Sequence, residues 1–388
     1  METYAIVSDE LVLPSGIDGF GYLIIEDGKF GRVSVERPEG MRIVDRRGCW
    51  VAPGLVDTHI HGFADCDVMD CDPSAIHTIT RELAKRGTTS WLATTLTASA
   101  EKTGRACASV AEAVAAQAKD PDFVGARTQG IFLEGPFFTE EHKGAQDPRY
   151  LIDPSMALLE DWQAQAGGLI CKTALAPERE GAIEYVAAAT AAGYTAAIGH
   201  SSATYGEAAA AVLAGARVVV HTFNGMDDLG HREPGIVGCA MTSQGLYSEL
   251  ICDGKHVDPV ACEVLVRSKG WEHVALITDC LSCGGLPDGD YFIGELPIEL
   301  RGGAAYLKNG GNLAGSTLTL VDAVRNVASW GLVTPEQAIR MASEVPARSC
   351  GIDDRCGQIL PGRDADLVVL DAQLGLVETY VGGRRVRA

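Results

Sequence analysis

The sequence predicts an α/β protein whose larger part is a closed (β/α)8 barrel of the TIM type. Eight segments have the length and composition of strands, and several of them are apolar runs without polar alternation, which is typical of strands buried on both faces of a parallel sheet. They cover Leu55–His59, Thr88–Thr94, Gln129–Glu134, Ile170–Ala176, Thr195–His200, Arg217–His221, Tyr247–Cys252 and Val274–Asp279. Alanine-rich amphipathic stretches of helical length lie between many of them, at residues 74–86, 101–118, 181–192 and 204–214. Eight β/α units in this order predict a closed barrel.

The two ends of the chain predict a second, smaller unit. Short β-like runs alternate with glycine and aspartate turns in residues 3–50 and again from about 357 to 386. Neither segment could fold alone, but together they can form a β-sandwich, because the ends of a barrel chain emerge close in space. We therefore expect a small β-sandwich domain from residues 1–52 and 355–388, and a barrel domain from residues 53–354.

Composition and charge exclude several classes of protein. A chain of 388 residues with 46% hydrophobic residues can bury the core of one large domain and one small domain. The net charge of −20 argues against nucleic acid and anionic membranes as partners. No apolar stretch approaches membrane-spanning length. The N-terminus has neither the basic segment nor the apolar region of a secretory signal, so we expect a cytoplasmic protein.

Twelve cysteines are scattered along the chain without a compact framework, and we expect them to be reduced thiols. Cys280 and Cys283 form a lone Cys-x-x-Cys pair directly after a predicted strand. Such a pair without a second one more commonly marks two loop thiols than a metal or redox site. Their position still makes them possible modifiers of a nearby site.

Metal-ligand side chains stand at the ends of five predicted strands. His59 and His61 are two residues apart, so they point to the same side of a strand, and neutral imidazole binds zinc, iron or nickel well. The carboxyl ends of all strands meet at one face of a barrel. Strands three, five, six and eight end at a carboxylate or an imidazole, namely Glu134, His200, His221 and Asp279. Any one of these histidines alone would more commonly be structural, but the set predicts a metal centre.

These residue types also predict a division of chemical roles. Glu134, His200 and His221 provide one carboxylate and two imidazoles for a divalent ion and leave a position for water, whose pKa the ion would lower. Asp279 can then act as the general base that accepts the proton of the water and returns it to a departing amine. The His59 and His61 pair adds the capacity for a second metal ion.

Several blocks of sequence resemble one family in collinear order over nearly the whole chain. The chain is similar to the metal-dependent amidohydrolases, and within them to the N-acetylglucosamine-6-phosphate deacetylase family with its N-acetylgalactosamine-6-phosphate relatives. The blocks are PGLVDTHIHG at 53–62, LEGPF at 133–137, GHS at 199–201, HTFNGM at 221–226, REPG at 232–235, DGKH at 253–256, TD at 278–279 and LAGS at 313–316.

The resemblance implies a metal-dependent enzyme that hydrolyses the acetamide of an N-acetyl-hexosamine 6-phosphate to the amino sugar 6-phosphate and acetate. N-acetylglucosamine 6-phosphate is the favoured substrate. Zinc is the favoured ion, one or two per subunit, with iron, cobalt or manganese as alternatives. Other amidohydrolases commonly use a carboxylated lysine on the fourth strand, whereas here Glu134 on the third strand takes the bridging role. The resemblance assigns substrate contacts to Ala145, Gln146, Asn224, Gly225, Arg232, Asp253, His256, Leu313, Ala314 and Gly315.

Arg232 offers a planar fork of donors suited to a phosphate. The resemblance implies that it reaches the active site of a neighbouring subunit, together with His256 as a second candidate, and hence that the protein is a homodimer. The alternative for Arg232 is a surface salt bridge with Glu233. One departure concerns Gln146, which stands where the family usually has histidine. Glutamine can donate from its amide but has no titratable proton, so either the rate or the acyl substrate could differ.

Two further functions stay open at this point. One is hydrolysis of N-acyl amino acids or cyclic amides by another amidohydrolase, against which Arg232 and the REPG block argue. The other is a non-enzymatic scaffold, which would be expected to have lost metal ligands. The gluco and galacto epimers of the sugar differ at one hydroxyl, and the sequence favours neither on physical grounds.

Overall fold

The centre of the molecule is a barrel of eight parallel strands, seen in a computed structural model that describes residues 3–14 and 16–387. Each strand pairs in parallel with the next along the chain. The strands are β8 (Leu55–Ile60), β11 (Thr88–Thr94), β12 (Arg127–Phe137), β13 (Ile170–Leu175), β14 (Thr195–Ile198), β15 (Val218–Val219), β16 (Tyr247–Leu250) and β17 (Val274–Leu276). The predicted fold class is confirmed.

The first and last strands meet just beyond the end of β17. The backbone N–H of Asp279 donates to the carbonyl of His59 at 2.9 Å, and the carbonyl of Cys280 accepts from the N–H of His61 at 2.9 Å. The Thr278 hydroxyl also donates to the buried Asp57 carboxylate, at 2.6 Å. These bonds place the ends of strands one and eight side by side.

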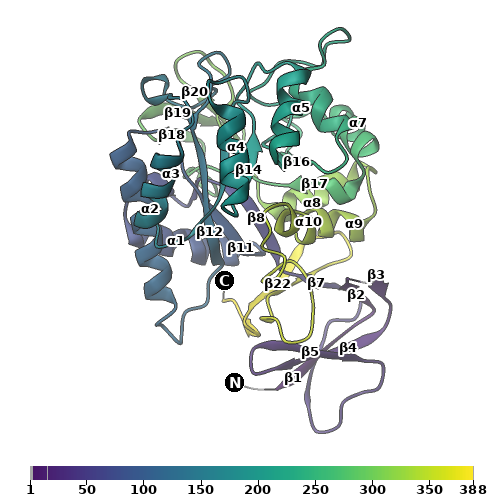
Figure 1. Cartoon of the computed structure of the whole chain (residues 1–388). Coiled ribbons are helices and arrows are strands. Elements are labelled where there is room, and N and C mark those ends of the chain that lie inside the picture. The colour runs from purple at the N-terminus through teal and green to yellow at the C-terminus, as the bar shows by residue number, and fades with distance from the viewer. Residues whose placement is uncertain (1–2, 15, 388) are drawn as a thin grey trace.

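Helices surround the barrel, as Figure 1 shows. Sequence signals explain where some of them begin. Asp72 caps the start of a helix whose first residue is a proline, and Thr204 and Glu207 form a reciprocal capping box at the start of another. The helices are α1 (Pro73–Ala84), α2 (Ala100–Gln117), α3 (Met156–Gln165), α4 (Ala182–Ala191), α5 (Tyr205–Ala214), α6 (Gly235–Thr242), α7 (Pro259–Lys269), α8 (Leu320–Ser329), α9 (Pro335–Met341) and α10 (Glu344–Ser349).

The amino end of the barrel is closed by α10. Its buried Val345 and Ala347 join one apolar cluster with barrel side chains such as Phe132 and Val218. The junction of α9 and α10 is tied to the first strand, because the Ala342 carbonyl accepts from the N–H of Val56 at 2.9 Å. Solvent and ligands therefore reach the barrel from its carboxyl end.

Two further sheets lie at the foot of the barrel (Figure 1). The four-stranded sheet comes from the N-terminal segment, and both ends of the chain contribute to the six-stranded sheet. Side chains from both sheets share one core, including Ile6 from the N-terminal segment and Leu367 from the C-terminal segment. The four-stranded sheet contains β5 (Lys29–Ser34), β4 (Gly21–Glu26), β1 (Tyr4–Ser8) and β6 (Arg42–Asp45); the six-stranded sheet contains β23 (Arg384–Arg385), β22 (Leu376–Val381), β21 (Leu367–Leu370), β7 (Trp50–Pro53), β2 (Glu10–Leu13) and β3 (Gly16–Asp18).

Two small β elements at the carboxyl end of the barrel were not predicted. A hairpin of β9 (Gly62–Phe63) and β10 (Cys66–Asp67) follows the first barrel strand. An antiparallel sheet of β18 (Gly289–Ile293), β19 (Leu296–Arg301) and β20 (Ala304–Leu307) follows the last one. Among the residues that the structure describes, no helix has the length and hydropathy needed to cross a membrane.

Candidate active site

Three of the predicted site residues lie just beyond their strands rather than inside them. β14, β15 and β17 end at Ile198, Val219 and Leu276, so the strands that were expected to reach His200, His221 and Asp279 are shorter. All three residues adopt positive φ angles, of 48°, 27° and 50°. Left-handed backbone is uncommon for residues other than glycine and is concentrated at functional sites. The turn of the chain directs each side chain across the mouth of the barrel.

The hydrogen bonds of four histidines fix which ring nitrogen carries the proton. Nδ1 of His61, His200 and His221 lies 3.2, 2.7 and 3.0 Å from the backbone carbonyls of Thr94, His142 and Asn224. Because a carbonyl only accepts, each Nδ1 must be the donor. Nδ1 of His59 donates in the same way, at 2.9 Å, to the Glu249 carboxylate. In its neutral form, each of these rings therefore presents the lone pair of its Nε2 to the site.

These Nε2 atoms converge on one carboxylate. Nε2 of His221 lies 3.2 Å from Oε1 of Glu134 and 3.0 Å from Nε2 of His200. Nε2 of His59 lies 3.1 Å from the same oxygen, is buried, and has no hydrogen-bond partner within the described part of the chain. Electron-rich atoms at these separations repel one another unless a cation lies among them. Two or three imidazoles with a carboxylate are the donor set that divalent transition metals prefer, so the residues fit a metal ion.

A second group of possible ligands adjoins the first. Nε2 of His61 lies 3.1 Å from Oδ1 of Asp279 and 3.4 Å from Oε2 of Glu134, and Nε2 of His59 lies 3.6 Å from the same Asp279 oxygen. The ligand atoms of His59, His61 and Asp279 all lie within 4.8 Å of one another, as do those of His59, Glu134 and His221. Two groups of residues could therefore each hold an ion. His59 belongs to both groups, and Glu134 contacts residues of both.

The electrostatics of the cluster favour positive charge at its centre. Burial opposes protonation of His59, but the Glu134, Glu249 and Asp279 carboxylates around it raise its pKa to about 10. Burial would raise the pKa of Glu134, yet the charge of His59 and the side-chain contacts with His200 and His221 hold it well below its usual value. The pKa of Asp279 is lowered because His59 and His61 together outweigh burial. Both carboxylates are therefore anionic at neutral pH and attract a cation.

A cavity of about 290 Å³ opens directly above the cluster. Glu134, His61, His200, His221 and Asp279 form its floor, while His59 lies beneath it, fully buried. Of the predicted substrate contacts, those that line this cavity are Ala145, Gln146, Asn224, Gly225, His256, Leu313, Ala314 and Gly315.

Two predicted substrate contacts lie outside that cavity. Asp253 lies behind His256, and the Asp253 carboxylate accepts from Nδ1 of His256 at 2.7 Å. The other ring nitrogen of His256, Nε2, is buried and has no partner among the described residues. Arg232 is exposed. The predicted alternative for it, a salt bridge with Glu233, is absent from the described structure, and the Glu233 carboxylate accepts instead from the backbone N–H groups of Tyr205 and Gly235.

Gln146 is held in one orientation by its neighbours. Its amide oxygen accepts from the backbone N–H of Thr97 at 2.8 Å, so its amide nitrogen must face the other way, where it donates to Oε2 of Glu134 at 2.6 Å. The side chain is buried at the rim of the metal-ligand cluster. Glutamine at this position therefore supplies one fixed donor to Glu134.

Sequence reasoning missed several residues that shape the site. Glu141, His142 and Asn312 line the cavity, and His142 also supplies the carbonyl that accepts from His200. Gly144 and Gly225 leave room for the His200 ring, because a Cβ there would lie 3.3 and 2.9 Å from its atoms. Gly225 was expected as a substrate contact but not in this role. The available sequence signal was glycine itself at both positions, since both have a positive φ.

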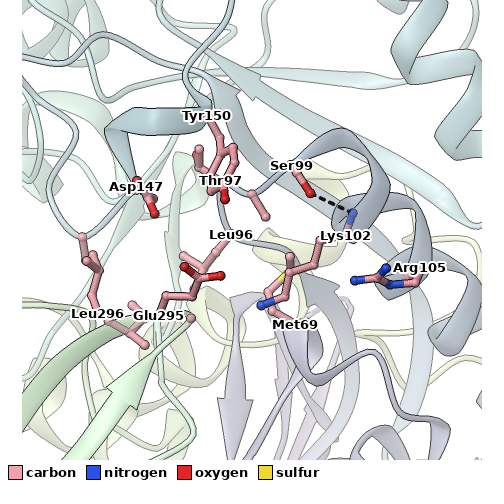
Figure 2. Close-up of a pocket in the computed structure, with 14 residues that line it drawn as sticks. Met69, Leu96, Thr97, Ser99, Lys102, Arg105, Asp147, Tyr150, Glu295 and Leu296 are labelled. Atoms are coloured by element: carbon pink, nitrogen blue, oxygen red, sulfur yellow. Dashed lines mark hydrogen bonds between the residues drawn. The ribbon is translucent and has the colours of Figure 1, made fainter.

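A second cavity, of about 170 Å³, adjoins the first and is shown in Figure 2. Leu96, Ala145 and Ile293 line both cavities. Lys102 and Glu295 extend into the second cavity from two sides (Figure 2). Because its lining carries both signs of charge, this cavity does not select an anion or a cation.

All twelve cysteines are free thiols, as expected. Cys280 and Cys283 are buried, and burial raises the pKa of Cys280 well above its usual value and that of Cys283 to about 11. Protonated, buried thiols are poor nucleophiles and poor metal ligands. The Cys-x-x-Cys pair therefore packs beside the site without the properties of a redox centre.

Comparison with known proteins agrees with this fold and with this site. Residues 50–386 match the model of the amidohydrolase family. The chain therefore belongs to the amidohydrolase family, whose members are metal-dependent.

Among the similar proteins are deacetylases of two amino sugar phosphates. The N-acetylglucosamine-6-phosphate deacetylase of Vibrio furnissii is 40% identical over 334 residues, which are 86% of this chain and 82% of that protein. The N-acetylgalactosamine-6-phosphate deacetylase of Escherichia coli O157:H7 is 37% identical over 354 residues, 91% of this chain and 92% of that protein. Among solved structures, an N-acetyl-D-glucosamine-6-phosphate deacetylase mutant from Mycobacterium smegmatis, in complex with N-acetyl-D-glucosamine-6-phosphate, superimposes with a TM-score of 0.93 at 28% identity and covers 100% of both chains.

Proposed function

We propose that this protein is a metal-dependent deacetylase that hydrolyses the acetamide of N-acetylglucosamine 6-phosphate to the amino sugar phosphate and acetate. The observation that carries the proposal is the convergence of the His200 and His221 lone pairs on Glu134 beneath an open cavity. The relatives add support, because proteins similar over most of their length are deacetylases of this substrate or of its galacto epimer.

The chain's own residues would hold the ion as follows. Glu134, His200 and His221 form the principal position, with His59 and His61 available for a second ion, and zinc suits these ligands. When bound, such an ion polarises an amide carbonyl and lowers the pKa of water, which an unactivated amide requires. Iron, cobalt and manganese are alternatives with the same ligands.

Asp279 is the proposed general base. It lines the cavity, and His59 and His61 lower the pKa of its carboxyl group, so it is ionised at neutral pH and able to accept the proton of the attacking water. Returning that proton to the amide nitrogen makes the amine a competent leaving group. Gln146 keeps one oxygen of Glu134 in place through its 2.6 Å hydrogen bond.

Substrate recognition is proposed to involve two subunits. The Nε2 of His256 and the backbone at Gly225, Leu313 and Gly315 border the cavity and can donate to phosphate or to sugar hydroxyls. Arg232 is exposed and lies outside the cavity of its own subunit, so we infer a homodimer in which it reaches the phosphate in the partner's active site.

We also propose the domain division and the location of the protein. The proposed division is at residues 1–52 with 355–388, and 53–354. It is supported by one apolar cluster made of residues from the two terminal segments alone, among them Ile6 and Leu367. Twelve free thiols suit a reducing compartment such as the cytoplasm.

One assay separates the candidate functions. Acetate release is measured for N-acetylglucosamine 6-phosphate, N-acetylgalactosamine 6-phosphate, both unphosphorylated sugars and an N-acyl amino acid. We expect the highest kcat/KM with the glucosamine phosphate. A higher value for the galacto epimer would reassign the substrate, and a higher value for unphosphorylated sugars or N-acyl amino acids would contradict the proposal. A protein that binds no divalent metal ion when one is supplied, and that releases acetate from none of these substrates, would indicate a scaffold.

A further inference from the structure

A buried charged chain lies below the metal-ligand cluster, inside the barrel. Glu249 on β16 and Lys172 on β13 are both fully buried, and their side chains form an ion pair. The other carboxylate oxygen of Glu249 accepts from Nδ1 of His59 at 2.9 Å. Lys172, Glu249 and His59 thus form a continuous series that ends at the buried Nε2 of His59.

Neighbouring groups fix the far end of this series. Nζ of Lys172 lies 3.3 Å from the carbonyl of Thr58, which precedes His59 in the same strand, and 3.8 Å from the centre of the Phe132 ring. The His59 ring meets the same Phe132 ring edge-on, with centroids 4.9 Å apart. Phe132 therefore lies against both Lys172 and His59.

His59 differs from the other three histidines of the cluster in the partner of its Nδ1. His61, His200 and His221 donate to neutral backbone carbonyls, whereas His59 donates to a carboxylate. A carboxylate behind an imidazole fixes its tautomer and increases its basicity as a metal ligand. A carboxylate buried alone would be strongly destabilising, and the Lys172 ammonium supplies the compensating charge.

We propose that Glu249, held by Lys172, is a positioning residue that makes His59 a strong metal ligand and thereby determines whether a second metal ion binds at His59, His61 and Asp279. This inference rests on the proposed metal centre but not on the identity of the substrate. Lys172 lies on the fourth strand, and its engagement with Glu249 and Thr58 leaves the metal ligands to other residues.

The test measures zinc per subunit by elemental analysis during dialysis against zinc buffers of graded free concentration. We expect the wild-type protein to hold two ions in two steps. Glu249→Gln keeps the size of the side chain but removes its charge, and it should weaken the second step about 10- to 100-fold, the range for lost outer partners of metal ligands. The first step, at Glu134, His200 and His221, should change less than threefold.

Two control variants separate positioning from folding. Glu344→Gln removes another buried carboxylate, one that pairs with Arg340 and Arg348, and should leave both zinc steps unchanged. The double variant Glu249→Leu with Lys172→Met replaces the pair by apolar groups, which should restore the thermal midpoint relative to Glu249→Gln but should not restore the second zinc step.

The outcomes are distinguishable. The inference would be overturned if Glu249→Gln bound zinc in the same two steps as the wild type. It would also be overturned if this variant unfolded and lost both steps in parallel, or if the wild-type protein bound only one ion. A wild-type protein that binds no divalent ion at any concentration would contradict the proposed function itself, and the inference with it. If the double variant binds the second zinc ion as tightly as the wild type does, the charge behind His59 is not what holds that ion.

Discussion

The Nε2 atoms of His200 and His221 lie 3.0 Å apart while both rings donate their Nδ1–H to backbone carbonyls. Two lone pairs therefore face each other beside the Glu134 carboxylate. This relationship points to a cation more directly than a sequence motif does, because it follows from the hydrogen-bond partners of the two rings and not from the identity of the side chains alone.

Removing one member of that pair should remove the ion. In His200→Ala, one of three strong ligands of the principal position is lost, so bound metal and acetate release should fall together by at least about tenfold. Elemental analysis and the acetate assay on the same sample check this. Full activity in a metal-free His200→Ala protein would show that the ion is not needed.

Replacing the general base should separate metal binding from turnover. Asp279→Asn keeps the shape of the side chain but cannot accept a proton, so kcat should fall at least about a hundredfold. KM and the ion of the principal position should persist, because that position does not include Asp279. Steady-state kinetics with metal analysis give both quantities, and a kcat loss below tenfold would point to another base.

Arg232→Ala should act only on the phosphorylated substrate. A charge-assisted hydrogen bond left unmade costs about 1.5–3 kcal/mol, so KM for the 6-phosphate should rise roughly tenfold or more, with little change for the unphosphorylated sugar. Equal effects on both sugars would make Arg232 structural.

Subunit mixing tests where that arginine works. Inactive Asp279→Asn subunits and weakly active Arg232→Ala subunits are combined, and mixed dimers are isolated with two affinity tags. One of the two sites then has an intact Asp279 and the partner's Arg232, so activity should recover in part. Verified mixed dimers without recovery would place Arg232 in the site of its own subunit.

The Asp253–His256 pair should affect binding more than turnover. The buried Nε2 of His256 faces the cavity while Asp253 fixes its Nδ1–H, so His256→Ala should raise KM for the 6-phosphate about tenfold and change kcat less than threefold. Asp253→Asn should shift KM in the same direction by less, since the ring stays in place. A kcat loss with unchanged KM would instead assign His256 to the chemical step.

The sequence predicted those features that have a local signal. Runs such as Val274–Leu276 are apolar throughout because both faces of a barrel strand are buried, and the polar residues that follow them are therefore conspicuous. The β18–β20 sheet was missed because its strands are short and partly exposed, and so lack a clear hydrophobic pattern.

The role of Glu249 could not be predicted for a different reason. Its partners Lys172 and His59 lie 77 and 190 positions away in the sequence, so only the closed barrel brings the three together. A single charged residue inside an apolar run otherwise gives no sign of its partners. The exact strand ends at His200, His221 and Asp279 were also beyond prediction, because their left-handed backbone is imposed by the surrounding loops.

The most direct test is acetate release from N-acetylglucosamine 6-phosphate by the same protein before and after metal removal. Protein stripped with a chelator and then dialysed should release acetate at a small fraction of the original rate, and added zinc should restore most of that rate. Acetate release that continues undiminished in protein shown to be metal-free would contradict the assignment of Glu134, His200 and His221 as the ligands of a required ion.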